Sequence, residues 1–352
     1  MFNQSRLSSN YPLVSVILPI RNEGKYIEKC LSTIIEQDYD LDKIEILVVD
    51  GASEDNTKEI VKKLCVKHKN VRLLHNPWRV VPTAMNIGIR NAKGNVIVRV
   101  DGHTILEKDY ISQGIEYLKK TQADNVGGLM RAIGKTYLSS AIAFATSSPF
   151  GIGNAAFHYS NKEQYVDTVY MGIYPREVFH KIGLFDEELV RNQDDELNYR
   201  LRKAGGRIFI TPQIKSYYYN RGSLQSLWKQ YFQYGFWKIR VLQKHPKMMQ
   251  LRQFLPACFI LSIMTSILLS SWNFFFFYLL LFILLSYSVC NFYSCFRIAK
   301  KESWKYLPML PITFATLHLS YGTGFLAGLA KFLPNWFKKE PEPPKLPKNS
   351  TE

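Results

Sequence analysis

The first hundred residues alternate short runs of Val and Ile with segments of helical spacing, and this alternation restricts the fold more than any other feature. Continuous apolar runs of this length are typical of strands buried on both faces. Four runs have this composition: 14–19, 44–50, 71–75 and 95–101. Three segments of helical spacing separate them: 25–37, 55–68 and one that Pro82 opens. The β-α-β order predicts an α/β fold with a mostly parallel sheet and right-handed crossovers.

Acidic and imidazole side chains follow two of these strands. Asp50 ends the second strand, and Asp101 and His103 end the fourth. Ligands of parallel sheets bind beyond the carboxyl ends of strands. An Asp and a His can together bind a divalent ion, although each alone is usually structural. A third acidic group, Asp194 to Glu196, begins a predicted helix at 192–206, where acids also serve as simple caps.

Positive charge is concentrated in one part of a chain whose formal net charge is +16. Residues 200–252 carry twelve Lys or Arg, and no acid occurs between Glu196 and Glu302. Such a segment can attract nucleic acid, anionic lipid or phosphorylated substrates. Because an apolar region follows directly, we expect a membrane surface and a phosphate-bearing substrate. We expect no nucleic-acid partner, since no groove-reading motif accompanies the charge.

Two uncharged apolar runs, 254–271 and 274–293, each approach the roughly 20 residues that span a bilayer. Trp272-Asn273 between them allows a tight hairpin, and basic residues flank both sides. Both ends of the hairpin are therefore expected in the cytoplasm. A third segment, 307–330, contains Pro and Gly and could either cross or re-enter the membrane.

The start of the chain lacks the apolar core of a secretory signal, and the five cysteines form no CxxC pair. We therefore expect reduced thiols and a cytoplasmic α/β domain on the inner membrane. Five regions are predicted: a polar tail (1–12), an α/β domain (13–222), an amphipathic helix (223–253), a membrane region of two to three helices (254–333) and a disordered basic tail (334–352). The amphipathic helix could lie in the membrane interface, pack on the protein, or do both.

Four segments, in this order and at these separations, resemble the inverting glycosyltransferase 2 family with the GT-A fold: "VSVILPIRNE", "ILVVDGASEDNT", "VRVDGHT" and "NQDDELNYRL". The resemblance covers roughly residues 13–245. "NPWRVVPTAMNIGIRNAKG", "DTVYMGIY" and "QYFQYGFWKIRVLQKHP" further resemble the succinoglycan-biosynthesis subgroup of glucosyltransferase-like membrane enzymes.

The resemblance implies a role for each matching residue. Residues that would border the nucleotide of the donor are Pro19, Arg21, Glu23, Asp50 and Asn86. Asp101 would be the first acid of the family's DxD motif, and His103 stands where the second acid is expected. Together they would hold a divalent metal, Mg or Mn, on the diphosphate. Asp194 would be the catalytic base, with Asp195 as a rival because Gln193 replaces the Glu of the family's Glu-Asp pair.

These implications predict an enzyme that moves one sugar from a nucleotide-sugar donor, a UDP-sugar, to a lipid-linked saccharide with inversion. Exopolysaccharide or cell-surface glycan synthesis is the expected setting. Processive members of the family carry a QxxRW motif, whereas Gln233 is here followed by Phe236 and Trp237. A processive polysaccharide synthase and a catalytically idle scaffold subunit remain the alternatives.

Overall fold

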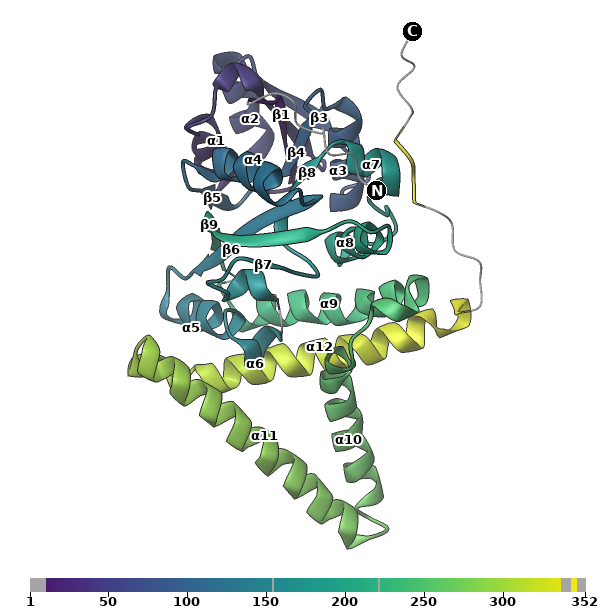
Figure 1. The fold of residues 1–352 in the computed structure, drawn as a ribbon. Helices are drawn as coiled ribbons and strands as arrows, with labels where there is room; N and C mark the ends of the chain where they lie inside the picture. Colours follow the sequence, from purple (N-terminus) through teal and green to yellow (C-terminus); the bar gives the residue numbers. More distant parts are fainter. Residues whose placement is uncertain (1–10, 154, 221, 337–342, 347–352) are drawn as a thin grey trace. The chain divides into compact units, whose positions relative to one another are not determined.

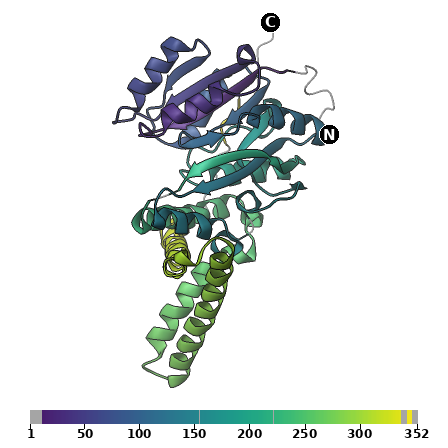
Figure 2. The ribbon, with the colours of Figure 1, turned by 90° about the vertical axis from the view of Figure 1, so that its left-hand side faces the viewer.

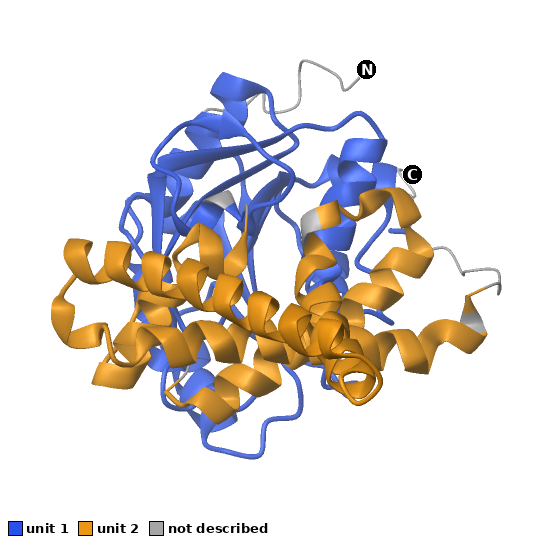
Figure 3. Ribbon diagram, turned by 90° about the horizontal axis from the view of Figure 1, so that it is seen from below, with its two compact units in different colours: residues 1–131, 155–218, 341–352 blue, residues 132–154, 219–340 orange. Residues whose placement is uncertain are grey.

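The computed structural model describes residues 11–153, 155–220, 222–336 and 343–346. The chain divides into two compact units, coloured separately in Figure 3. The first comprises residues 1–131, 155–218 and 341–352, and the second comprises 132–154 and 219–340. Residues 132–154, which the sequence placed in the α/β domain, thus group with the helices that follow residue 218.

The first unit is built on a sheet of mixed direction (Figure 1). Its parallel half has the order β3-β2-β1-β4, as the alternation of runs and helices predicts. The bounds of these strands are β1 Val14–Ile20, β2 Ile44–Asp50, β3 Val71–His75 and β4 Val96–Arg99. β4 ends two residues earlier than predicted, so Asp101 and His103 lie in the loop that follows it.

The other half of the sheet is antiparallel. β8 pairs antiparallel with β4 and β6, and β9 pairs antiparallel with β5 and β7. The bounds are β5 Thr104–Leu106, β6 Asn125–Ile133, β7 Gln164–Tyr165, β8 Tyr170–Pro175 and β9 Ile208–Tyr219. β9 is one strand of 12 residues, "IFITPQIKSYYY". β6 was missed, because Gly127 and Gly128 interrupt its apolar pattern.

Helices cover both faces of this sheet. Alternate residues of β1 point to opposite sides, so Val16 and Leu18 belong to one core and Ile17 to the other. The first core contains α1 Ile27–Ile35, α2 Thr57–Lys67 and α4 Tyr110–Thr121. The second contains α3 Val81–Asn91, α7 Glu177–Ile182 and α8 Gln193–Lys203. α8 ends at Lys203, before the predicted end at residue 206, and Gly205 beyond it takes a left-handed backbone with φ +83°.

The predicted disorder of the tail 334–352 does not hold for residues 343–346. The backbone N–H of Leu184 donates to the Pro344 carbonyl at 2.8 Å, and Leu346 is buried in the second core. The polar, proline-rich composition predicted disorder, but the single apolar side chain of Leu346 is enough to pack into the core. Most of the predicted tail 1–12 lies outside the described residues, as does most of the rest of 334–352.

The second unit is helical. α9 (Leu224–Lys244) corresponds to the predicted amphipathic helix, and α12 (Leu310–Phe332) packs along it. Their backbones approach closely: an added Cβ on Gly324 or Gly328 of α12 would overlap the carbonyl oxygen of Phe232 or Phe236. Two short helices, α5 (Tyr137–Thr146) and α6 (Pro149–Ile152), also pack on α12.

The two apolar runs form a helical hairpin (Figures 1 and 2). Both of its helices, α10 and α11, contact α12. α10 (Leu255–Leu269) has 15 residues and α11 (Phe274–Lys301) has 28. Among the described residues, α11 alone is long and apolar enough to cross a membrane. α10 is apolar but shorter than the predicted segment, about 22 Å at 1.5 Å per residue. The third predicted segment, α12, does not meet this criterion.

Candidate active site

The loops that follow β1 and β2 are tied together by hydrogen bonds. Ser53 Oγ accepts from the backbone N–H of Asn22 at 2.9 Å, and Asn22 Oδ1 accepts from that of Glu54 at 2.8 Å. Thr57 Oγ1 accepts from the backbone N–H of Glu23 at 2.8 Å. Asn22 itself adopts a left-handed backbone with φ 55°, a conformation that Asn tolerates better than most residues. Two strand ends are thus held as one rigid rim.

Asp50 lies at the base of this rim as the last residue of β2. Its carboxylate is almost fully buried, accepts from the backbone N–H of Ser53, and lies 3.6 Å from Lys58 Nζ. Pro19, also predicted to border the donor, is buried within β1 beside Val49. A buried carboxylate at a strand end is suited to accept a hydrogen bond from a ligand.

An exposed carboxylate, Glu54, stands between two guanidinium groups on the same rim. Glu54 Oε1 lies 3.8 Å from Arg21 and 3.2 Å from Arg79. The three side chains come from the loops after β1, β2 and β3. Arg21 was predicted as a site residue, whereas Arg79 was not, because the "NPWRVVP" loop carries no spacing signal of its own.

Asp101-Gly102-His103 follows β4 and packs against the loop after β1. His103 Nδ1 lies 2.8 Å from Glu23 Oε1, so Glu23 contacts the imidazole. Gly102 permits this approach, since an added Cβ would lie 2.7 Å from Ile20 Cγ2 and 3.2 Å from Glu23 Cγ. A carboxylate on one ring nitrogen fixes the orientation of a histidine and leaves the other nitrogen for a ligand.

Arg99, for which no role was predicted, connects Asp101 with Asp194. Arg99 is the last residue of β4, and its side chain is only 9% exposed. Its Nε donates to Asp101 Oδ1 at 3.0 Å, and its Nη1 lies 3.8 Å from Asp194 Oδ2. The fold therefore brings Asp194, which belongs to the acidic group 194–196, to the end of β4.

These charges shift one another's pKa values. Burial alone would lower the pKa of Arg99, but Asp101 and Asp194 outweigh it and raise that pKa above its ordinary value. Burial would raise the pKa of Asp101, but Arg99 and then His103 outweigh it and lower that pKa. The pKa of Asp194 is raised, first by desolvation, against the opposing charge of Arg99, with Asp195 adding to the rise.

Asp194 and Asp195 occupy the first turn of α8, which begins after Asn192 in a left-handed conformation. The backbone N–H of Asp195 donates to Asp194 Oδ1 at 3.0 Å. That bond fixes one carboxylate oxygen of Asp194, while Oδ2 faces Arg99. The side chain of Asp194 is 34% exposed and thus reachable from solvent.

Asn86, a predicted donor-site residue, lies on α3 and is fully buried. Its amide nitrogen donates to the Phe185 carbonyl and to Glu187, and its Oδ1 accepts from the backbone N–H of Phe185. Asn86 thus holds the loop that leads to α8. A contact between Asn86 and the donor stays a prediction. It requires the amide of Asn86 to give up its hydrogen bonds to Phe185 or Glu187 for bonds to the donor.

Asp101 and His103 suit a divalent ion that a diphosphate helps to bind. No cluster of three or more His, Cys, Asp or Glu able to hold a metal occurs among the described residues. Mg²⁺ and similar ions use one or two protein carboxylates and complete their shell with waters and substrate phosphates. The unshared nitrogen of His103 and the carboxylate of Asp101 are consistent with that incomplete set.

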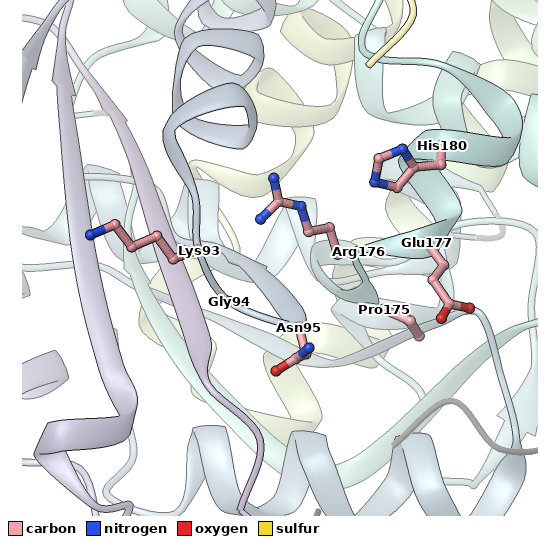
Figure 4. Close-up of a pocket in the computed structure, with 7 residues that line it drawn as sticks. All are labelled: Lys93, Gly94, Asn95, Pro175, Arg176, Glu177 and His180. Atoms are coloured by element: carbon pink, nitrogen blue, oxygen red, sulfur yellow. The ribbon is translucent and has the colours of Figure 1, made fainter. Parts of the chain in front are cut away.

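A small pocket elsewhere in the first unit is unrelated to these residues. It measures about 210 Å³ and is shown in Figure 4. Lys93, Gly94 and Asn95, which precede β4, form one side, and Pro175 and Arg176 at the end of β8 form another. Since Asp101 follows β4, the pocket lies at the opposite end of that strand.

Comparison with known proteins gives a consistent result. The sequence profile of glycosyl transferase family 2 matches residues 15–183. The succinoglycan biosynthesis protein ExoA of Rhizobium meliloti (strain 1021) is 32% identical over 243 residues, which cover 68% of this chain and 73% of that protein.

A second relative covers more of the chain. It is a dolichyl N-acetyl-alpha-D-glucosaminyl phosphate 3-beta-D-2,3-diacetamido-2,3-dideoxy-beta-D-glucuronosyltransferase of Methanococcus voltae, 29% identical over 326 residues. The match spans 90% of this chain and 97% of that protein. Among solved structures, a mannosyltransferase of Pyrobaculum calidifontis in complex with GDP-Man and Mn²⁺ shares the fold. Its TM-score is 0.57 at 18% identity, with 90% of this chain and 87% of that chain covered.

Proposed function

Since this chain belongs to glycosyl transferase family 2, we propose that it transfers a single sugar from a nucleotide-sugar donor to a lipid-linked saccharide, with inversion. One observation carries the proposal: Asp101, beside His103, and Asp194 contact the same buried guanidinium, Arg99. The proposed diphosphate-binding group, Asp101, and the proposed base, Asp194, are thereby separated by a single side chain, that of Arg99.

The acceptor hydroxyl attacks the anomeric carbon of the donor from the side opposite the leaving group. The new carbon–oxygen bond forms as the bond to the diphosphate breaks, and Asp194 accepts the hydroxyl proton. Its pKa, raised by desolvation, makes it a stronger base than an exposed aspartate. Asp195 is the alternative base, adjacent on the same turn.

Asp101 and His103 would hold the divalent ion, Mg²⁺ or Mn²⁺, and Glu23 would keep the imidazole oriented. An ion held there would offset the negative charge that grows on the leaving nucleoside diphosphate. Asp50 and the rim that carries Arg21 are placed to border the nucleotide, and a UDP-sugar is our proposed donor. The structural relative's complex with GDP-Man and Mn²⁺ is compatible with this chemistry but does not select the nucleotide.

A lipid-linked acceptor is supported by two features. The name of the Methanococcus voltae relative describes transfer to a dolichyl phosphate-linked sugar, and that relative aligns along 97% of its length. Unit 2 also carries α10 and α11, whose large apolar side chains are mostly exposed. We propose that this hairpin anchors the enzyme in the inner membrane with its catalytic unit in the cytoplasm, in exopolysaccharide or cell-surface glycan synthesis.

The test is a screen of nucleotide sugars with purified full-length protein, polyprenyl phosphate-linked saccharides, and Mn²⁺ or Mg²⁺. We expect one donor to yield an acceptor lengthened by one sugar of inverted configuration. Asp101→Asn should abolish transfer, and excess chelator should suppress it in the wild type. A polymeric product would identify a processive synthase instead. If the protein neither hydrolyses nor transfers any donor, the result favours a scaffold subunit.

A further inference from the structure

The two acids that the proposed reaction needs come from separate parts of the fold. Asp101 follows β4, and Asp194 belongs to the first turn of α8, more than ninety residues later. Between them lies one cation, Arg99, whose side chain is 9% exposed. It contacts the two acids through different nitrogens: Nε at 3.0 Å from Asp101 and Nη1 at 3.8 Å from Asp194.

A guanidinium is suited to such a link because its nitrogens occupy fixed positions in one plane. Two carboxylates bound to different edges of that plane are held at a set separation. Lysine has the same charge but presents it as a point on a flexible chain, so it cannot fix both contacts. The surroundings add rigidity, since β4 is central in the sheet and Arg99 is buried there.

We infer that Arg99 is a positioning residue that sets the distance between the donor-side carboxylate, Asp101, and the acceptor-side base, Asp194. The inference rests on the proposed glycosyl transfer at this site. It makes Arg99 the link through which a change at one acid alters the other. When Asp194 loses its charge, Arg99 pairs with Asp101 alone and competes more strongly with a metal ion for that carboxylate.

The first experiment replaces Arg99 with Lys and with Gln in the full-length protein. Because positioned bases contribute about 10² to 10⁴ in rate, we expect Arg99→Lys to lower kcat about 30-fold or more. Binding of Mn²⁺ with UDP or GDP, measured by calorimetry, should change much less than kcat, because Asp101 and His103 both remain. Arg202→Gln is the matched control. Arg202 lies on α8, as Asp194 does, and forms an ion pair with Asp167 at 2.9 Å. The kcat of this variant should stay within about twofold of the wild type.

The second experiment is a cycle that a merely structural arginine would not affect. With Arg99 present, Asp194→Asn should weaken binding of Mn²⁺ and nucleotide about threefold; in an Arg99→Gln background the same change should have almost no effect. An equal effect in both backgrounds overturns the inference. If Arg99→Gln does not fold, Arg99→Lys decides alone, and a kcat within about twofold of the wild type overturns the inference.

Failure of the inference can be told from failure of the proposed function. The wild-type protein must bind Mn²⁺ with a nucleotide and transfer sugar in the same assays. If it does neither, the proposed function fails and Arg99 has no pair of sites to connect. If it does both and the Arg99 variants match it, the inference alone is wrong.

Discussion

At the scale of single residues, both carboxylate oxygens of Asp194 have defined partners. Asp194 faces Arg99 with one carboxylate oxygen and accepts the backbone N–H of Asp195 with the other. These contacts orient the carboxylate of Asp194 and favour it as the base.

Asp194→Asn keeps the shape of the side chain and removes its basicity. We expect transfer to fall by about 10² to 10⁴, because the acceptor hydroxyl then keeps its proton in the transition state. Nucleotide affinity, measured on the same protein, should change by less than about fivefold, since Asp50 and Asp101 remain. Asp195→Asn is the control and should retain most of the rate. The reverse ranking would move the role to Asp195, and lost affinity would make Asp194 part of the donor site.

The pH dependence of transfer should report the same carboxylate. Asp194 must be ionised to accept a proton, so the rate rises with pH through its pKa and then levels off. Because desolvation raises that pKa above the ordinary 3.8, the acid limb should lie at a higher pH than for an exposed aspartate. Asp195→Asn removes a negative charge that contributes to the rise, so it should shift the limb to lower pH. A limb that does not move in that variant would contradict the assignment.

Glu23, predicted to border the nucleotide, contacts His103 in the structure, and its place beside the nucleotide stays a prediction. Glu23→Gln should weaken Mn²⁺ affinity about tenfold in the presence of nucleotide, since orienting partners of metal ligands typically contribute 10- to 100-fold. Titration with Mn²⁺ checks this. Glu36→Gln, an exposed change at the end of α1, should leave the affinity unaltered. Unchanged Mn²⁺ affinity in Glu23→Gln would remove the orienting role.

At the scale of elements, the contact between α9 and α12 depends on small residues. Gly324 and Gly328 face backbone carbonyls of α9, and Gly235 of α9 faces the Tyr321 carbonyl of α12. Backbone at this distance has no space for a methyl group. The pairing explains how a helix rich in Lys and Arg packs closely on a second helix.

Gly324→Ala tests this packing through the sign of its effect. In an open helix the change would stabilise by about 1 kcal/mol, because Ala has the higher helix propensity. Here the added carbon overlaps the Phe232 carbonyl, so we expect destabilisation of about 1–3 kcal/mol. Thermal unfolding in detergent measures it. Ala330→Val, on an exposed position of the same helix, should have little effect. A stabilised Gly324→Ala protein would show that the helices are farther apart.

At the scale of the whole molecule, membrane association should depend on the α10–α11 hairpin. Its exposed side chains include Leu281 and Leu285 on α11. Replacing both with Arg places two charges where lipid is expected, at a cost of about 2.5–3.5 kcal/mol each near the centre of a membrane helix. Carbonate washing of membranes should then release the variant but not the wild type. Val66→Arg, at an exposed position of α2 in the first unit, is the control. Release of the wild-type protein would contradict the anchor.

The order of the first four strands, the fold class and the family could be determined from the sequence, and all three are confirmed: the chain has the GT-A fold of glycosyl transferase family 2 and is a transferase. The reason is local. β1, β2 and β4 are buried on both faces, so their apolar composition alone identifies them as strands. Asp50 and Asp101 could then be picked out because they stand where two of these strands end.

The tertiary structure decided what depends on contacts between distant residues. No spacing in the sequence relates Arg99 to Asp194, Glu23 to His103, or Leu346 to the core, because each pair meets only when separate elements pack. β6 was missed for the same reason, since its glycines suit close packing in the sheet but weaken any local strand signal. Sequence pattern reports which face of an element is buried, whereas the partner across that face is set by the fold.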